Sequence, residues 1–319
     1  RSLQLATMHT SNNGALAYVW TKSNDAVTVN TAGQLDSTIN LGFATVNKVN
    51  LAATTYELGK QLVINRPLVI SGPVDGEKAI LTANANATWP TKENKPNEIV
   101  SSTANLISIE ATGSGEVSIS NLTVKNSKAS GINVQPAEGI TTSLKNIYLE
   151  NNAHAGLLVH GIAKAEGLHT IGNVWGGVNV DKKQSYSPKF TFTADCSFDE
   201  PSQIWAEKEN VASSNVVTLP SSGDWRMFEG KGGANNAVDM YYWTNASLNK
   251  EVKDANELVA AINTAQPGQV ITLTGKDYGD ENAIQSFGTV KAAGVTIKAA
   301  DATKKPKVYG TIKILAENC

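Results

Sequence analysis

The stretch from Asn121 to Val180 contains one fourteen-residue pattern three times. The copies read NLTVKNSKASGINV from Asn121, NIYLENNAHAGLLV from Asn146 and GLHTIGNVWGGVNV from Gly167. Within each copy, apolar and polar residues alternate over two short segments, which is the pattern of half-buried β-strands. Each copy therefore predicts two short strands joined by a turn.

The turns of the three copies carry asparagine and glycine at matching places. Asn126, Asn151 and Gly172 form one column, and Gly131, Gly156 and Gly177 form another. These residue types suit backbone that needs a positive φ. A repeat of this length cannot bury its apolar side alone, whereas stacked copies can. We therefore predict a parallel β-helix in which successive coils pair at about 4.8 Å.

The repeats resemble the right-handed parallel β-helix of the pectin-lyase-like superfamily. The pair Asn126 and Asn151 resembles the asparagine ladder of its tight turn. The stretch NELVAAINTAQPGQVITLTGKDY from Asn256 resembles the entry segment of β-helix polysaccharide lyases related to chondroitinase B. The resemblance implies an all-β solenoid with short amphipathic capping helices. It implies no single activity, because this scaffold carries lyases, hydrolases, tailspikes and adhesins.

The beginning of the chain recurs after 223 residues. Trp20-Thr21 matches Trp243-Thr244, and Asn12-Asn13 matches Asn235-Asn236. Further pairs, in register apart from one single-residue shift, are Leu35 with Leu258, Ile39 with Ile262, Leu51 with Leu273 and Tyr56 with Tyr278. We predict one complete β-helix unit with an N-terminal cap over residues 1–228, and the start of a second, tandem-related unit over residues 229–319. Asp254 is the expected N-cap of the second capping helix.

The composition excludes several classes of function. With 27 basic and 29 acidic residues, the chain offers no basic face for nucleic acid. No apolar run approaches the roughly 18 residues that span a bilayer. The chain has no initiator Met and no signal peptide, which we interpret as a mature or excised segment. Cys196 and Cys319 can form a disulfide or stay as thiols. Few cysteines and a β-solenoid favour an extracellular or cell-surface monomer.

Positions between the apolar ones are expected to face solvent and to stack into columns along the solenoid. One column holds Tyr148 and His169, and a turn column holds His154 and Trp175. Two further columns are Asn133, Leu158, Asn179 and Gln135, His160, Asp181. Aromatic faces stack on the apolar faces of sugars, so we predict ligand binding by Tyr148, Trp175, His154 and His169. Trp89, in a polar loop over Asn84–Glu98, is a fifth candidate.

We recognise no set of catalytic residues typical of an enzyme with this fold in the sequence. A β-helix lyase needs a Lys or Arg base and acidic Ca²⁺ ligands. Lys182 and Lys183, beside Asp181, are the best base candidates, but no acidic cluster accompanies them. A glycoside hydrolase of this fold needs paired aspartates on adjacent coils together with a His-Gly element. His160-Gly161 is present, but the paired aspartates are not. His154, His160 and His169 fall in different columns, so no zinc site is expected. We expect no cofactor, and no residue pattern supports a Ca²⁺ ion.

These observations favour a non-catalytic, extracellular carbohydrate-binding or adhesive module. The expected ligand is an extended or insoluble polysaccharide, such as cellulose or another cell-wall glycan. Two alternatives stay open at this point: a polysaccharide lyase of the β-helix class, and a structural surface-layer or stalk repeat.

Overall fold

The computed structural model describes residues 3–10, 16–22, 26–40, 46–90, 104–183, 186–200, 202–232, 238–245, 249–266, 268–275, 277–292, 294–301, 303 and 305–316. The chain divides into two compact units. The first comprises Arg1–Ile204 with Asn210–Ser222, and the second comprises Trp205–Glu209 with Gly223–Cys319. The main change of unit thus falls at Ser222/Gly223, six residues before the predicted boundary. That the second unit is a tandem copy stays a prediction.

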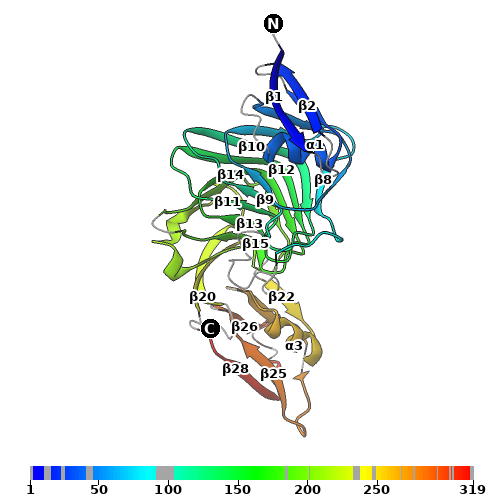
Figure 1. Cartoon of the computed structure of the whole chain (residues 1–319). Coiled ribbons are helices and arrows are strands. Elements are labelled where there is room, and N and C mark those ends of the chain that lie inside the picture. The colour runs from blue at the N-terminus through cyan, green and yellow to red at the C-terminus, as the bar shows by residue number, and fades with distance from the viewer. Residues whose placement is uncertain are drawn as a thin grey trace. The chain divides into compact units, whose positions relative to one another are not determined.

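The first unit is a parallel β-helix (Figure 1). Its long strands β10 (Gly115–Lys125), β12 (Ile140–Glu150) and β14 (Ile162–Ile171) come from successive coils. They pair in parallel, with Leu122 opposite Ile147 and Ile147 opposite Leu168. All three of these side chains are buried, as is Leu149. The predicted all-β fold, and the interior position of the alternating apolar residues, are confirmed.

Two sheets wrap this interior. The first contains β3 (Val27–Val29), β4 (Lys48–Leu51), β7 (Leu68–Ser71), β10, β12, β14, β16 (Lys189–Phe192) and β19 (Val217–Thr218), joined by β5 (Thr55–Leu58), β8 (Ala79–Ala83) and β17 (Ser197–Phe198). The second runs through β6 (Leu62–Ile64), β9 (Ile107–Ile109), β11 (Ile132–Val134), β13 (Ala155–Val159) and β15 (Gly176–Val180).

The outer face of the second sheet differs from the expectation. Asn133, Leu158 and Asn179 lie in register as predicted, but all three are buried, and Asn133 is only 1% exposed. The expectation that this column faces solvent is therefore wrong. Alternation decides which side of a strand a residue occupies, but it does not decide whether that side is buried.

The turn between the sheets has the predicted backbone. Asn126, Asn151 and Gly172 have φ values of 57°, 52° and 70°. The asparagine ladder, however, lies one residue further on. Asn152 Nδ2 donates to Asn173 Oδ1 at 2.7 Å, and Asn173 Nδ2 donates to Glu200 Oε1 at 2.5 Å. The assignment of the ladder to Asn126 and Asn151 is corrected by these bonds.

The second glycine column lies where the backbone of the next coil and, at Gly131 and Gly156, an amide of this ladder come close. A Cβ atom at Gly131 would lie 2.9 Å from Asn152 Nδ2, and one at Gly156 would lie 2.9 Å from Asn173 Nδ2. Both distances are shorter than real Cβ contacts allow. Glycine is required here for space.

Several elements of the second unit follow in the same order as elements at the beginning of the first. Antiparallel β1 (Leu3–Thr10) and β2 (Leu16–Lys22) correspond to β20 (Arg226–Gly232) and β21 (Val238–Thr244). Helix α1 (Ala32–Asn40) corresponds to α3 (Ala255–Asn263). The helix η2 (Ser214–Val216) belongs to the first unit, and η1 (Lys208–Asn210) ends where the chain returns to that unit. The remaining elements are β18 (Ile204–Glu207), β22 (Asn249–Val252), β23 (Val270–Leu273), β24 (Asp277–Tyr278), β25 (Gln285–Val290), β26 (Thr296–Ala299), β27 (Lys307–Val308) and β28 (Gly310–Ile314).

The first turns of the two short helices α1 and α3 are held in the same way. Gln34 N donates to Thr31 Oγ1 at 3.2 Å, and Glu257 N donates to Asp254 Oδ1 at 2.9 Å, so Asp254 is the N-cap as predicted. In both units a buried tyrosine anchors the strand before the helix: the hydroxyl of Tyr56 donates to Val29 O at 2.7 Å, and that of Tyr278 to Val252 O at 2.6 Å. The side chain of Trp20, like the two Asn-Asn pairs, lies outside the described residues.

Within the part of the chain that the structure describes, no helix is long and apolar enough to cross a membrane.

Candidate functional site

His154 and Trp175 form a ring stack on neighbouring coils. The backbone N–H of Trp175 donates to His154 O at 3.2 Å, which aligns the two side chains in one turn column. Their ring centroids lie 3.6 Å apart with an interplanar angle of 8°. Trp175 is nevertheless 48% exposed. The predicted column is therefore present, and it holds an indole that stacks on His154 and is partly exposed to solvent.

Two exposed apolar residues lie close to Trp175 in the chain. Val174 is 74% exposed, and Ile171 at the end of β14 is also exposed. Beneath them, His154 Nδ1 is buried and has no hydrogen-bond partner among the described residues. Burial lowers the pKa of His154, so its imidazole is neutral at pH 7. A neutral ring suits a flat stack on an indole, and the result is a rigid, largely apolar surface.

Tyr148 and His169 form a second stack on β12 and β14. The two residues are register partners, and their ring centroids lie 4.6 Å apart. Lys78 Nζ lies 3.2 Å from the centroid of the Tyr148 ring and comes from the coils that precede β12. His169 belongs to the coil that follows β12. Both faces of the Tyr148 ring are thus covered, and the geometry does not favour its predicted role as a stacking platform for a sugar.

His169 presents a polar edge instead. Its Nδ1 lies 2.8 Å from Ser197 Oγ on β17. Burial, and then the charge of Lys78, lower the pKa of His169, whereas Asp195 and Asp199 act in the opposite direction. The imidazole is therefore neutral at pH 7, and with the Ser197 hydroxyl it can exchange hydrogen bonds with a polar ligand.

Trp89 lies elsewhere and is only 4% exposed. Its indole N–H donates to Asn84 O at 3.3 Å, within the loop that was predicted over Asn84–Glu98. The part of that loop from residue 91 onward lies outside the described residues. A buried indole does not offer a face to a sugar, so the geometry does not favour Trp89 as a ligand-binding residue.

Of the two lysines considered as catalytic bases, Lys183 has a side-chain hydrogen-bond partner in the structure. Lys183 Nζ donates to Gln135 Oε1 at 2.6 Å, and His160 Nδ1 lies 3.0 Å from Asp181 O. Among the residues that the structure describes, no group of three His, Cys, Asp or Glu side chains could hold a metal ion. Cys196 is a buried free thiol.

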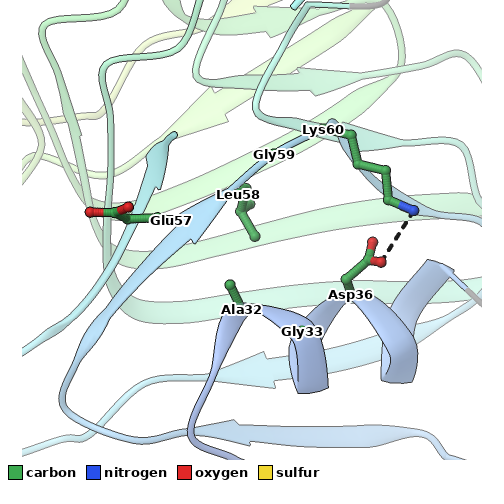
Figure 2. A pocket seen from close by; sticks show the side chains of 7 residues that line it. All are labelled: Ala32, Gly33, Asp36, Glu57, Leu58, Gly59 and Lys60. Carbon is green, nitrogen blue, oxygen red and sulfur yellow. Dashed lines mark ion pairs between the residues drawn. The ribbon is translucent and has the colours of Figure 1, made fainter. Parts of the chain in front are cut away.

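One hollow was not anticipated from the sequence. It lies between α1 and the turn that follows β5, and Figure 2 shows an ion pair between Asp36 and Lys60 across it. The two segments are more than twenty residues apart in the chain, so the sequence does not show that they meet. The only signal in the sequence is that each segment contains a glycine, Gly33 and Gly59.

Comparison with protein-family models, with curated proteins and with solved structures finds no match.

Proposed function

We propose that the first unit is a non-catalytic carbohydrate-binding module of an extracellular or cell-surface protein. Its ligand is an extended or insoluble polysaccharide, such as cellulose, and it binds at the surface formed by Trp175, Val174 and Ile171. The observation that carries the proposal is the half-exposed indole of Trp175, stacked at 3.6 Å on His154.

The physical argument rests on complementarity. A pyranose ring has an apolar face of C–H groups that packs on an aromatic ring, and the exposed apolar side chains beside Trp175 extend that contact. The stack on His154 fixes the indole, so little side-chain entropy is lost when a sugar binds.

The type of scaffold supports a glycan as the ligand. The segment from Asn256 resembles the entry segment of β-helix lyases related to chondroitinase B, and we take this resemblance as support for the class of ligand alone. A solenoid presents equivalent positions at about 4.8 Å intervals, which suits a ligand that is itself a repeating chain.

The test is a depletion assay on insoluble polysaccharides, with cellulose as the first probe. Trp175→Ala should weaken binding by about three- to tenfold, because one aromatic stack contributes about 0.5–1.5 kcal/mol. The circular dichroism spectrum should stay the same. Ile284→Ala is the matched control, since Ile284 is an apolar residue that is 80% exposed in the second unit. It should bind as the wild type does.

The same assay separates the alternatives. Unsaturated products with an ultraviolet absorbance, formed from uronate polymers, would support a lyase. Neither binding nor product formation on any glycan would support a structural stalk. Full binding by Trp175→Ala would remove this surface from consideration.

A further inference from the structure

The second unit contains a coil whose three strands all lie at the edges of their sheets (β26 and β28 in Figure 1). In its sheet, β26 comes last after β22 and β23, and β27 and β28 each pair with one strand only, β24 and β25. Among the residues that the structure describes, no strand pairs with the outer edge of β26, β27 or β28. We call these three strands the open coil.

The first unit shows what covers the matching strands. There, β7, β8 and β9 pair with β4, β5 and β6, just as β26, β27 and β28 pair with β23, β24 and β25. On their other side, β7 and β8 pair with β10, and β9 pairs with β11. Ile109 of β9 is 2% exposed, whereas Ile314, at the matching place in β28, is 55% exposed. Ile297, Val308 and Ile312 are only partly buried, although they pack against the core of the second unit.

The backbone of the open coil offers hydrogen-bonding groups to a further strand. Leu315 N donates to Val290 O at 3.0 Å, toward the preceding coil. Because successive N–H groups of a strand point to opposite sides, those of Ile312 and Ile314 point away from that coil. In the first unit, Ile107 N at the matching place donates to a backbone carbonyl of the next coil at 3.0 Å.

The open coil is also basic. Each of its strands carries one exposed lysine, Lys298, Lys307 and Lys313, whereas the covered strands β7, β8 and β9 contain no charged residue. From Val295 to Ala316 the sequence has five lysines and one acidic residue, Asp301. Lysine at a strand edge hinders indiscriminate pairing, and like charges opposite each other on paired strands are destabilising. This edge therefore disfavours a second copy of itself and favours a strand that carries carboxylates.

We propose that the open coil binds an acidic, extended segment of another polypeptide, which pairs with it as the next coil. The backbone of the segment accepts from the N–H groups of Ile312 and Ile314, its apolar side chains cover Ile297 and Val308, and its carboxylates lie opposite the three lysines. Main-chain hydrogen bonds supply affinity in this mode of recognition, and alternate side chains supply specificity. The surface lies in the second unit, so the proposal does not depend on polysaccharide binding by the first.

The probe is a synthetic peptide with the sequence Gly115–Val134, the coil that covers β7, β8 and β9 in the first unit. In that coil, Ser120, Thr123 and Asn133 pair with the residues that match the three lysines. The acidic probe therefore carries Ser120→Glu, Thr123→Glu and Asn133→Glu. In an NMR titration of the whole chain at low ionic strength, it should bind about tenfold more tightly than the unsubstituted peptide, as expected for three partly exposed charge pairs. High salt should reduce this preference by screening.

Hydrogen exchange and two variants test the geometry. The acidic probe should slow the exchange of the Ile312 and Ile314 amides at least tenfold, whereas the amide of Leu315, which is already bonded, should change little. Lys298→Gln should weaken binding of the acidic probe about two- to threefold, as the loss of one exposed charge pair would. Lys250→Gln is the matched control, because Lys250 is an exposed lysine on β22, at the other edge of the same sheet; it should leave the affinity unchanged.

Four results would overturn the proposal. The first is the absence of binding of the acidic probe up to about 1 mM. Binding that leaves the amides of Ile312 and Ile314 unprotected would show attraction by charge alone. Protection of these amides without any peptide would show that the edge is already covered, and protection that rises with the concentration of the chain would identify a second copy as the occupant.

Discussion

Replacement of Asn173 by alanine should strongly destabilise the first unit, because this buried side chain links three neighbouring coils. Its Oδ1 accepts from Asn152 N at 3.0 Å and from Asn152 Nδ2 at 2.7 Å. Its Nδ2 donates to Leu149 O at 2.9 Å and to Glu200 Oε1 at 2.5 Å. The substitution would remove four hydrogen bonds from a region that excludes water.

The magnitude follows from the groups left without partners. The backbone N–H and side-chain amide of Asn152, and the carbonyl of Leu149, would each lose a partner in a buried place. A stranded buried group costs about 1–3 kcal/mol. Because these costs are not additive within one network, we expect a loss of about 3–5 kcal/mol in the free energy of unfolding.

Urea denaturation followed by far-ultraviolet circular dichroism measures this loss. The control is Asn151→Gly, which places at φ 52° the residue that the next repeat carries as Gly172. Glycine adopts this conformation without strain, so the control should change stability by less than about 0.5 kcal/mol. A loss below about 1 kcal/mol in Asn173→Ala would refute the reasoning. The hydrogen bonds of the ladder would then stabilise the folded state hardly more than hydrogen bonds to water do.

Two further predictions concern the same unit. Leu149→Ala should cost about 2–5 kcal/mol by urea denaturation, since Leu149 is fully buried between coils and truncation leaves a cavity; a change below about 0.5 kcal/mol would contradict this packing. Burial lowers the pKa of His154, His160 and His169 below the ordinary value of 6.5, so the folded state binds fewer protons than the unfolded state as the pH falls below 6.5. The melting temperature should therefore drop between pH 7 and pH 5, and His154→Gln should reduce that drop; an equal or larger drop in the variant would show that His154 is not among the groups responsible.

The alternation of apolar and polar residues was sufficient to predict the repeating parts of the fold. Alternation placed Leu149 inside, and the turn columns identified the positive φ of Asn126 and Asn151. It also aligned His154 with Trp175, because stacked coils bring equivalent positions of a repeat together. These features depend on strand geometry alone, which repeats from coil to coil.

Features that depend on contacts between different parts of the chain needed the tertiary structure. Lys78 reaches the ring of Tyr148 from an earlier coil, and this contact covers a face that the sequence pattern left open. The ladder lies at Asn152 and Asn173 because side-chain direction in a turn is set by the neighbouring coil.

The surface of the molecule illustrates the same division. By itself, the sequence determined a parallel β-helix and the columns along it, because backbone pairing and apolar burial act at every repeat in the same way. Only the tertiary structure decided that Asn133 and Trp89 are buried and that a hollow lies beside α1. Cover and hollows arise where non-repeating segments meet the coils, and no periodic pattern records which segments meet.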